Sequence, residues 1–315
     1  HNCITQSGLS KKIEYAEAQI NAYLMAIEKD DTSNDDLKEK LQTYQNLKEQ
    51  YLNQKQELKD EGLEQKSLTD TDSRRMKNNG SLDICYNVQS VVDSQNHFVI
   101  DISTTNDIND QNQLYVMAKD ATELLDVENP TVIADTGYYN GTEIKNCIDD
   151  GMNVFIKKAK ANNSTKDNEF RKEKFLYDKE RDVYVCPAGN ELPFFENTSK
   201  NGMKYRKYKC SNCNSCKYKK ACTSSGTGRT IQRWEHESIL ESVYQDTWNN
   251  NDIYKQRRCI VEHPFGTVKR TLGYSFFLRC QMDNVDAEAA SMFIAYNFKR
   301  LLSMFSTQEL IKKFR

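Results

Sequence analysis

The chain has 315 residues, a formal net charge of −2 and 37% hydrophobic residues, with a mean hydropathy of −0.82. This length favours about two domains, and the low apolar fraction predicts small hydrophobic cores. The near-zero net charge excludes a protein that coats nucleic acid by bulk charge alone. Because the sequence has neither a run long enough to cross a bilayer nor a signal-peptide pattern, we expect a cytoplasmic protein without a membrane partner.

Residues 1–66 predict an antiparallel helical hairpin. Apolar residues recur at spacings of three to four in two stretches, residues 9–27 and residues 37–58. A polar segment at residues 30–35 lies between them and predicts the turn. We interpret this first segment as a structural arm without chemistry of its own.

Residues 67–159 predict the first part of an α/β core. After Gly80 the hydrophobic period changes to two, which indicates strands. In chain order we expect strands at 82–92 and 98–103, a helix at 110–125, a strand at Thr131–Asp135, a helix at 142–150 and a strand at 153–156. The continuous apolar run before Asp135 is typical of a buried strand. Ligands of such sheets bind beyond the carboxyl ends of the strands, and Asp135 stands at one of these ends.

Residues 160–247 interrupt this pattern and predict an inserted subdomain, after which residues 248–315 return to helix and complete the core. The insertion holds polar loops, short strands and most of the clustered cysteines. From Lys200 to Arg233 it has ten Lys or Arg residues and no Asp or Glu, which predicts a basic face suited to DNA phosphates. The helix expected at 287–302 is apolar on one side and should pack on the sheet.

Two carboxylates are the strongest candidates for catalysis. Asp135 follows a short apolar strand, and Glu262 lies in a basic helical segment. Arg258 lies four residues before Glu262 on the same helical face, and Lys269, three turns beyond Arg258, has nearly the same azimuth, although Pro264 interrupts the helix. Carboxylate oxygens bind Mg²⁺ (or Mn²⁺), and two such ions can clamp the attacking and leaving oxygens of a phosphodiester. A turn residue at Asp135 and a surface ion pair at Glu262 are the alternatives.

Five cysteines of the insertion predict a metal centre. Cys210, Cys213, Cys216 and Cys222 have the spacing C-x2-C-x2-C-x5-C, and Cys186 stands upstream. Thiolates at this spacing can face one tetrahedral Zn²⁺, and structural zinc sites often use four cysteines, which leaves one of the five spare. An iron–sulfur cluster and free thiols are the alternatives. Zinc would supply folding energy to a segment with few apolar residues.

Two weaker features lie in the same subdomain. Trp234 and the run at residues 217–220 combine aromatic and basic groups, so stacking on bases near a cleaved end is one interpretation, although a Trp in a small hydrophobic patch is the commoner case. The tract Glu235-His236-Glu237 is a further, weaker candidate for a metal site.

Several motifs resemble those of DDE transposases from bacterial insertion sequences. Ala134-Asp135-Thr136-Gly137-Tyr138 and Arg258-x3-Glu262-x6-Lys269 are similar to the second and third catalytic motifs of that family. Further likeness lies in Gly80-Ser81-Leu82, Tyr86-Asn87-Val88-Gln89, Cys186-Pro187-Ala188-Gly189, Arg233-Trp234-Glu235-His236-Glu237 and Val261-Glu262-His263-Pro264-Phe265-Gly266. Together these motifs cover roughly residues 70–300.

The resemblance implies a ribonuclease H-like mixed sheet flanked by helices, with an insertion between the second and third carboxylates. It also implies Mg²⁺-dependent DNA strand cleavage and transfer at element ends, with terminal-repeat and target DNA as partners and a homodimer in the DNA complex. The residue roles that it implies are metal binding by Asp135 and Glu262, DNA contact by Arg258, Lys269 and Tyr254, and zinc binding by Cys186, Cys213, Cys216 and Cys222, with Cys210 additional.

The chain departs from the family pattern at two points. In related families a Tyr lies three residues before the Arg, whereas Tyr254 lies four residues before Arg258 and three before Arg257. The family's first Asp, in a motif like Asp-Gly-Ser/Thr-Lys, has no counterpart, so we expect an amino-terminally truncated copy with little or no strand transfer of its own. Asp70 and Asp72 are the alternatives for the missing carboxylate.

Three other functions fit parts of the sequence. A zinc-stabilised DNA-binding module without catalysis would use the basic, Cys-rich insertion, but it would give Asp135 and Glu262 no task. A nuclease of the same fold would hydrolyse DNA without joining it. A structural coiled-coil protein would account for residues 9–62 only.

Overall fold

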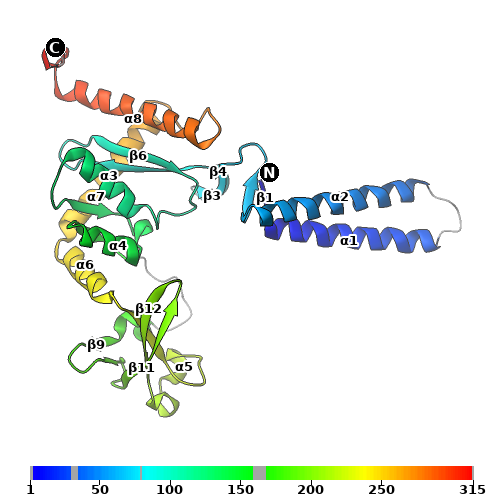
Figure 1. Cartoon of the computed structure of the whole chain (residues 1–315), viewed down its shortest axis with the longest axis horizontal. Coiled ribbons are helices and arrows are strands. Elements are labelled where there is room, and N and C mark those ends of the chain that lie inside the picture. Colours follow the sequence, from blue (N-terminus) through cyan, green and yellow to red (C-terminus); the bar gives the residue numbers. More distant parts are fainter. Residues whose placement is uncertain (1–2, 30–34, 79, 159–167, 314–315) are drawn as a thin grey trace. The chain divides into compact units, whose positions relative to one another are not determined.

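The computed structural model describes residues 3–29, 35–78, 80–158 and 168–313, and over these ranges the fold is mixed α/β (Figure 1). The chain divides into two units. Unit 1 consists of His1–Asp110 and Arg258–Arg315, and unit 2 consists of Gln111–Arg257. None of the helices in the described ranges is long and apolar enough to cross a membrane.

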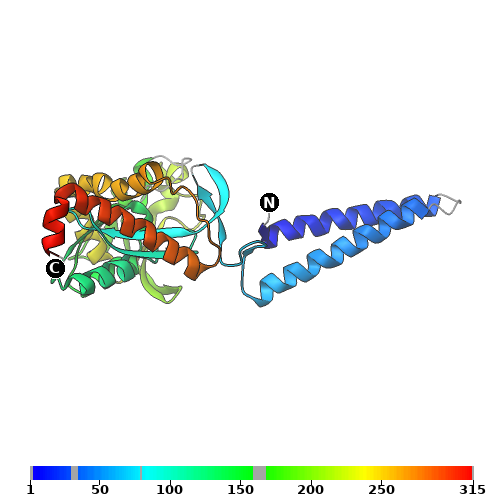
Figure 2. The same ribbon diagram turned by 90° about the horizontal axis from the view of Figure 1, so that it is seen from above.

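Unit 1 begins with two long helices, α1 (Gln6–Lys29) and α2 (Asp35–Asp60), which lie side by side (Figure 2). Leu9 of α1 and Leu58 of α2, two of the regularly spaced apolar residues, belong to one hydrophobic cluster, and both are almost fully buried. The predicted hairpin is thereby confirmed. Its turn lies outside the described residues except for Asp35, an acidic residue in the first turn of α2, where it complements the helix dipole.

The strands of unit 1 form three antiparallel pairs. They are β1 (Cys3–Thr5) with β2 (Gln65–Ser67), β3 (Arg74–Asn78) with β4 (Ser81–Cys85), and β5 (Asn87–Val92) with β6 (Val99–Thr105). The prediction of a single strand at 82–92 was wrong. The segment forms two strands, β4 and β5, which pair with different partners on either side of Tyr86. The Tyr86 hydroxyl donates to Asp70 at 2.7 Å, and its ring meets Phe277 edge-on, so this residue leaves both ladders.

Helix α8 (Met282–Met304) closes the outer edge of β6 and precedes the short α9 (Thr307–Lys313). The Asn297 side chain accepts from the Val99 N–H at 2.9 Å and donates to the Val99 carbonyl at 2.7 Å. Asp286 accepts from the Thr104 N–H at 2.8 Å. These side chains satisfy edge groups that another strand would otherwise pair, and Phe293 packs beside Val99 in the core. The predicted packing of this helix on a sheet is confirmed.

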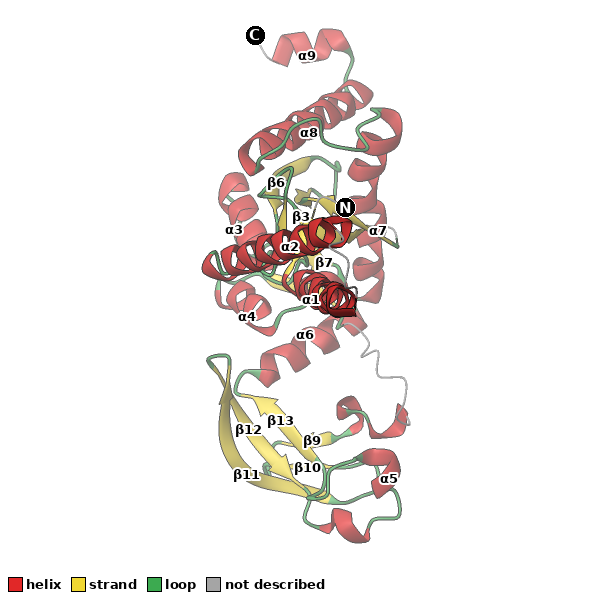
Figure 3. Cartoon of the chain, turned by 90° about the vertical axis from the view of Figure 1, so that its right-hand side faces the viewer, coloured by secondary structure: helices red, strands yellow, loops and turns green. Residues whose placement is uncertain are grey.

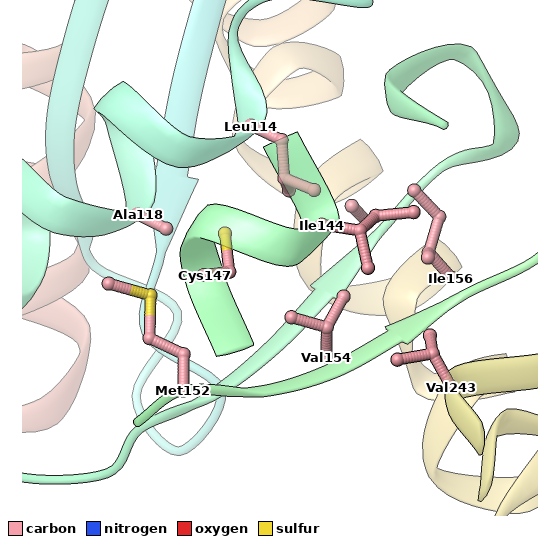
Figure 4. Packing of buried hydrophobic residues seen from close by; sticks show 9 residues of the cluster. Leu114, Ala118, Ile144, Cys147, Met152, Val154, Ile156 and Val243 are labelled. Atoms are coloured by element: carbon pink, nitrogen blue, oxygen red, sulfur yellow. The ribbon is translucent and has the colours of Figure 1, made fainter. Parts of the chain in front are cut away.

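Unit 2 begins with helix α3 (Leu114–Leu125) and a β-α-β segment made of β7 (Thr131–Ala134), α4 (Gly141–Asp149) and β8 (Asn153–Ile156). The two strands are parallel. Asn140 caps α4 by accepting the Thr142 N–H at 2.9 Å. The core of this segment forms around Ile144, Cys147 and Val154 (Figure 4). These elements agree with those predicted from the sequence.

The insertion in unit 2 is an antiparallel five-stranded sheet with the order β13-β12-β11-β10-β9 (Figure 3). Its strands are β9 (Leu176–Asp178), β10 (Val183–Val185), β11 (Glu191–Lys200), β12 (Met203–Lys209) and β13 (Thr230–Trp234). Asn201 and Gly202 join β11 to β12 with φ of 50° and 76°, the left-handed conformation that two-residue hairpin loops favour. Tyr208 and Leu192 are fully buried in the core of the insertion.

Helices α5 (Lys219–Cys222), α6 (Glu237–Asn249) and α7 (Asn251–Gly266) complete the chain order, with α7 beginning in unit 2 and ending in unit 1. In the described ranges the ladders are the five-stranded sheet and four separate strand pairs. The mixed α/β class is confirmed. A ribonuclease H-like sheet and the four-part division of the chain stay predictions.

Replacing Ile144 by Ala should destabilise unit 2 by about 2–5 kcal/mol, because its side chain is fully buried in the core on which β7 rests. Both tryptophans of the chain, Trp234 and Trp248, lie in unit 2, so their fluorescence in a urea titration follows this unit. Leu124→Ala is the matched control, since Leu124 is 67% exposed and its loss should change the free energy of unfolding by less than about 0.5 kcal/mol. Equal losses in the two variants would contradict the described core.

Candidate active site

Asp135 stands at the carboxyl end of β7 and is held through one carboxylate oxygen. Its Oδ1 accepts the Thr136 N–H at 2.6 Å and the Thr136 hydroxyl at 3.2 Å, and it pairs with the Arg257 guanidinium. The side chain remains 59% exposed, and no donor in the described part of the chain bonds to Oδ2. The carboxylate therefore has a fixed orientation and one oxygen open to a ligand.

The surroundings of Asp135 favour its ionised form. Partial burial raises the pKa of the Asp135 carboxyl, but the hydrogen bond from the Thr136 N–H and the pairing with Arg257 outweigh burial and leave that pKa below its usual range. Asp135 is consequently a carboxylate at neutral pH, the form that binds a hard cation.

Arg257, which sequence reasoning passed over in favour of Arg258, is the basic partner of Asp135. Its side chain is only 19% exposed, and its guanidinium lies 5.3 Å from the ring centroid of Tyr254. Lys157 lies 4.6 Å from the same ring, and Tyr254 is 7% exposed. The signal in the sequence was the spacing, because Tyr254 lies three residues before Arg257, as the family pattern of Tyr and Arg requires. DNA contact by Tyr254 stays a prediction.

Glu262 lies on α7 in unit 1 and is open to solvent. Its side chain is 70% exposed, and its Oε1 lies 3.6 Å from the Nε of Arg258, which is 74% exposed. Lys269 is exposed as well, but it lies in a π-helical turn, Thr267–Thr271, that follows Pro264. The α-helical spacing that predicted a shared azimuth for Arg258 and Lys269 does not continue through such a turn, so that prediction of geometry was wrong.

Asp135 belongs to unit 2 and Glu262 to unit 1, and their convergence on metal ions stays a prediction. Within the described ranges, no group of three or more His, Cys, Asp or Glu side chains has the geometry of a metal site. Each of the two residues nonetheless offers an exposed carboxylate, the donor type that Mg²⁺ and Mn²⁺ prefer.

Asp70 and Asp72, the alternatives for a first catalytic carboxylate, hold the start of α8. Asp70 accepts the Tyr86 hydroxyl at 2.7 Å and the Gln281 N–H at 3.3 Å. Asp72 accepts the Met282 N–H at 2.9 Å. Both therefore have a structural task at a helix N-terminus, where carboxylates complement the dipole.

The five clustered cysteines line one cavity of about 20 Å³, as their spacing predicted. They are Cys186, Cys210, Cys213, Cys216 and Cys222. The Asn190 N–H donates to the sulfur of Cys186 and the Arg229 N–H to that of Cys213, both at 3.3 Å. Burial raises the pKa of Cys210 to about 11. The donor type fits Zn²⁺, although the sulfurs lack the spacing of a metal site in this structure.

The weaker candidates of the insertion have local partners. Trp234 is 7% exposed and lies edge-on against His236. It is therefore a buried packing residue, which agrees with the interpretation of a Trp in a small hydrophobic patch. Glu237 accepts the Trp234 N–H at 3.2 Å and pairs with Lys172 at 3.0 Å. Within the tract Glu235-His236-Glu237, His236 therefore packs against Trp234, and Glu237 pairs with Lys172.

Arg257→Gln should raise the pKa of Asp135, because the cation that stabilises its carboxylate is removed. The pKa can be followed by NMR titration of the carbon-13-labelled carboxyl group. Arg258→Gln is the matched control one residue away, and it should leave the titration of Asp135 unchanged because Arg258 pairs with Glu262. A larger shift of the Asp135 pKa in Arg258→Gln than in Arg257→Gln would show that Arg257 is not the partner of Asp135.

Comparison with known families finds a match to the transposase DDE domain at residues 185–302. The matched segment includes Glu262 and all five clustered cysteines, whereas Asp135 lies before it. Comparison with curated proteins and with solved structures found no significant match. The matched domain points to transposition-related nuclease activity on DNA, a reaction for which such domains generally use divalent metal. Residues 185–302 therefore resemble a transposase DDE domain, and this likeness supports a DDE-type transposase.

Proposed function

We propose that this protein takes part in divalent-metal-dependent DNA cleavage and strand transfer at the ends of an insertion sequence. The observation that carries the proposal is Asp135, an ionised carboxylate fixed through Oδ1 at the carboxyl end of β7, with Oδ2 open. The family match, which contains Glu262, supports it independently. The proposal includes a ribonuclease H-like sheet with residues 160–247 as the insertion.

In this proposal Asp135 and Glu262 hold Mg²⁺ or Mn²⁺. When bound, such ions would stabilise the charge that develops on the scissile phosphate. Arg257 keeps the Asp135 carboxylate in one orientation through its ion pair, and supporting contacts of this kind tune ligands in metal sites. In the proposal the exposed side chains of Arg258, which pairs with Glu262 in this structure, and Lys269 contact DNA phosphates.

Element-end DNA and target DNA are the proposed partners, in a complex that contains two copies of the chain. The transposase match supports DNA as the substrate. A nuclease reaction without joining remains the second candidate for the same residues, and the products distinguish the two, since strand transfer links the element end covalently to target DNA.

We propose in addition that the cysteine cluster holds one structural Zn²⁺, with Cys186, Cys213, Cys216 and Cys222 as ligands and Cys210 spare. Two observations support it. All five thiols line one small cavity, and backbone N–H groups of Asn190 and Arg229 already point at cysteine sulfurs, the outer contacts that thiolate ligands of zinc commonly accept. The metal would hold together a segment whose core contains few aliphatic residues.

Asp135→Asn and Glu262→Gln should each slow Mg²⁺-dependent cleavage of element-end DNA at least about a hundredfold. The reason is that a metal site contributes several kcal/mol to the barrier, and each 1.36 kcal/mol is tenfold in rate. Gel analysis of labelled DNA measures the cleaved and joined products.

Glu123→Gln, an exposed acidic residue of α3, is the control and should cleave at the original rate. Binding of the same DNA without divalent metal should persist in all three variants, because the substitutions remove no positive charge. Cleavage by both site variants at the original rate would contradict the proposal.

Purified protein should carry about one zinc per chain, measured by inductively coupled plasma mass spectrometry, and Cys213→Ser should abolish it because a ligand is lost. Cys259→Ser is the matched control, since Cys259 is exposed on α7, outside the cluster. A full zinc content in the Cys213 variant, or iron in place of zinc, would refute the assignment.

A further inference from the structure

An exposed aromatic ring stands on the sheet of the insertion, at Phe195. The ladder between β11 and β12 pairs Phe194 with Tyr208 and then Glu196 with Lys207, so Phe195 is the extra residue of a β-bulge. Bulges of this kind re-aim a side chain relative to the regular alternation. Phe195 is 52% exposed, so much of its side chain is open to solvent.

Two ammonium groups lie over this ring in cation–π contacts. Lys209 Nζ lies 4.9 Å and Lys207 Nζ 5.8 Å from the Phe195 ring centroid. Both lysines belong to β12 and are two residues apart, so they share one face of the sheet. The neighbouring residues on the other face, Arg206 and Tyr208, instead bond to Asp182 within the protein.

The cross-strand neighbours extend the same face with mostly uncharged groups. On β13, Gln232 lies opposite Lys207 and Thr230 opposite Lys209, and both are exposed. On β11, Glu196 pairs with Lys207 at 2.7 Å. In the described ranges Lys209 has no carboxylate partner, so one of the two cations beside the ring is available to an anion.

We propose that this face, made of Phe195, Lys207, Lys209, Thr230 and Gln232, binds unpaired DNA, with a base on the Phe195 ring and the phosphates on the two lysines. Aromatic rings that stack bases beside cations that follow the backbone are the general means of holding single strands. A duplex keeps its bases stacked on one another and offers none to the ring. The inference rests on the proposed function, because strand cleavage at an element end is the reaction that leaves nucleotides unpaired.

The arrangement also assigns a role to Glu196. Its carboxylate occupies Lys207 in the free protein, so a DNA phosphate must compete with it. Replacing Glu196 by Gln should therefore tighten the binding of single strands, because one more cation becomes available and one like charge is removed.

The test measures fluorescence anisotropy of a labelled single-stranded oligonucleotide and of the matching duplex, with the whole chain and without added divalent metal. Phe195→Ala should weaken single-strand binding about tenfold or more and duplex binding less than about twofold, and Phe195→Trp should retain the original affinity. Lys209→Ala should lower the salt dependence of single-strand binding by about 0.7 in the log–log slope. Glu196→Gln should raise the single-strand affinity, a change that misfolding does not produce.

Trp248→Ala is the matched control, because Trp248 is a 63% exposed aromatic on α6, and it should leave both affinities unchanged. Unchanged single-strand binding by Phe195→Ala, or an equal loss of duplex binding, would overturn the inference. A Phe195-dependent preference for RNA of the same sequence would overturn the assignment to DNA. The binding test measures no cleavage, so its result is independent of the cleavage test. If single-strand binding depends on Phe195 while the Asp135 and Glu262 variants still cleave, the proposed function is refuted and the binding face is not.

Discussion

The packing of one short parallel strand fixes the place of the candidate catalytic carboxylate. Strand β7 pairs with β8 and shares its core with α4, where Ile144 is fully buried. The next residue after the strand is Asp135, so the core determines where its backbone stands, and Thr136 and Arg257 then determine how its carboxylate is turned. A hydrophobic core, a backbone N–H and one ion pair together produce an oriented anion with an open oxygen, and the proposed metal chemistry depends on that arrangement.

In the folded protein, several cations of the basic segment in the insertion form ion pairs with acidic residues. In the sequence, ten cations from Lys200 to Arg233 stand without an acidic residue among them. In the fold, acids from other segments neutralise several of them: Asp182 pairs with Arg206, Glu196 with Lys207 and Glu241 with Arg233. The free cations are therefore fewer than the count suggests, and their positions, such as that of Lys209 beside Phe195, carry more information about DNA than their number.

Much of the fold could be predicted from local patterns, because the hydrophobic period and the turn signals are properties of neighbouring residues. The helical hairpin, β7, α4 and β8 follow from such patterns. The close spacing of Cys210, Cys213, Cys216 and Cys222 indicated a cluster, and the fold adds Cys186 to the same cavity. The break at Tyr86 could not be predicted, since it depends on hydrogen bonding to Asp70. The spacing from Tyr254 is a sequence signal for Arg257, but the ion pair with Asp135 is visible only in the fold. Likewise, only the fold buries Trp234 while exposing Phe195.

The most direct test of the central claim is a crystal structure of the protein with element-end DNA and Mn²⁺, with the metal positions taken from anomalous scattering. The account predicts two manganese peaks about 3.5–4 Å apart, with Oδ2 of Asp135 bound to one of them and the carboxylate of Glu262 within the same pair. Manganese bound elsewhere, with Asp135 and Glu262 free of metal in the DNA complex, would contradict it.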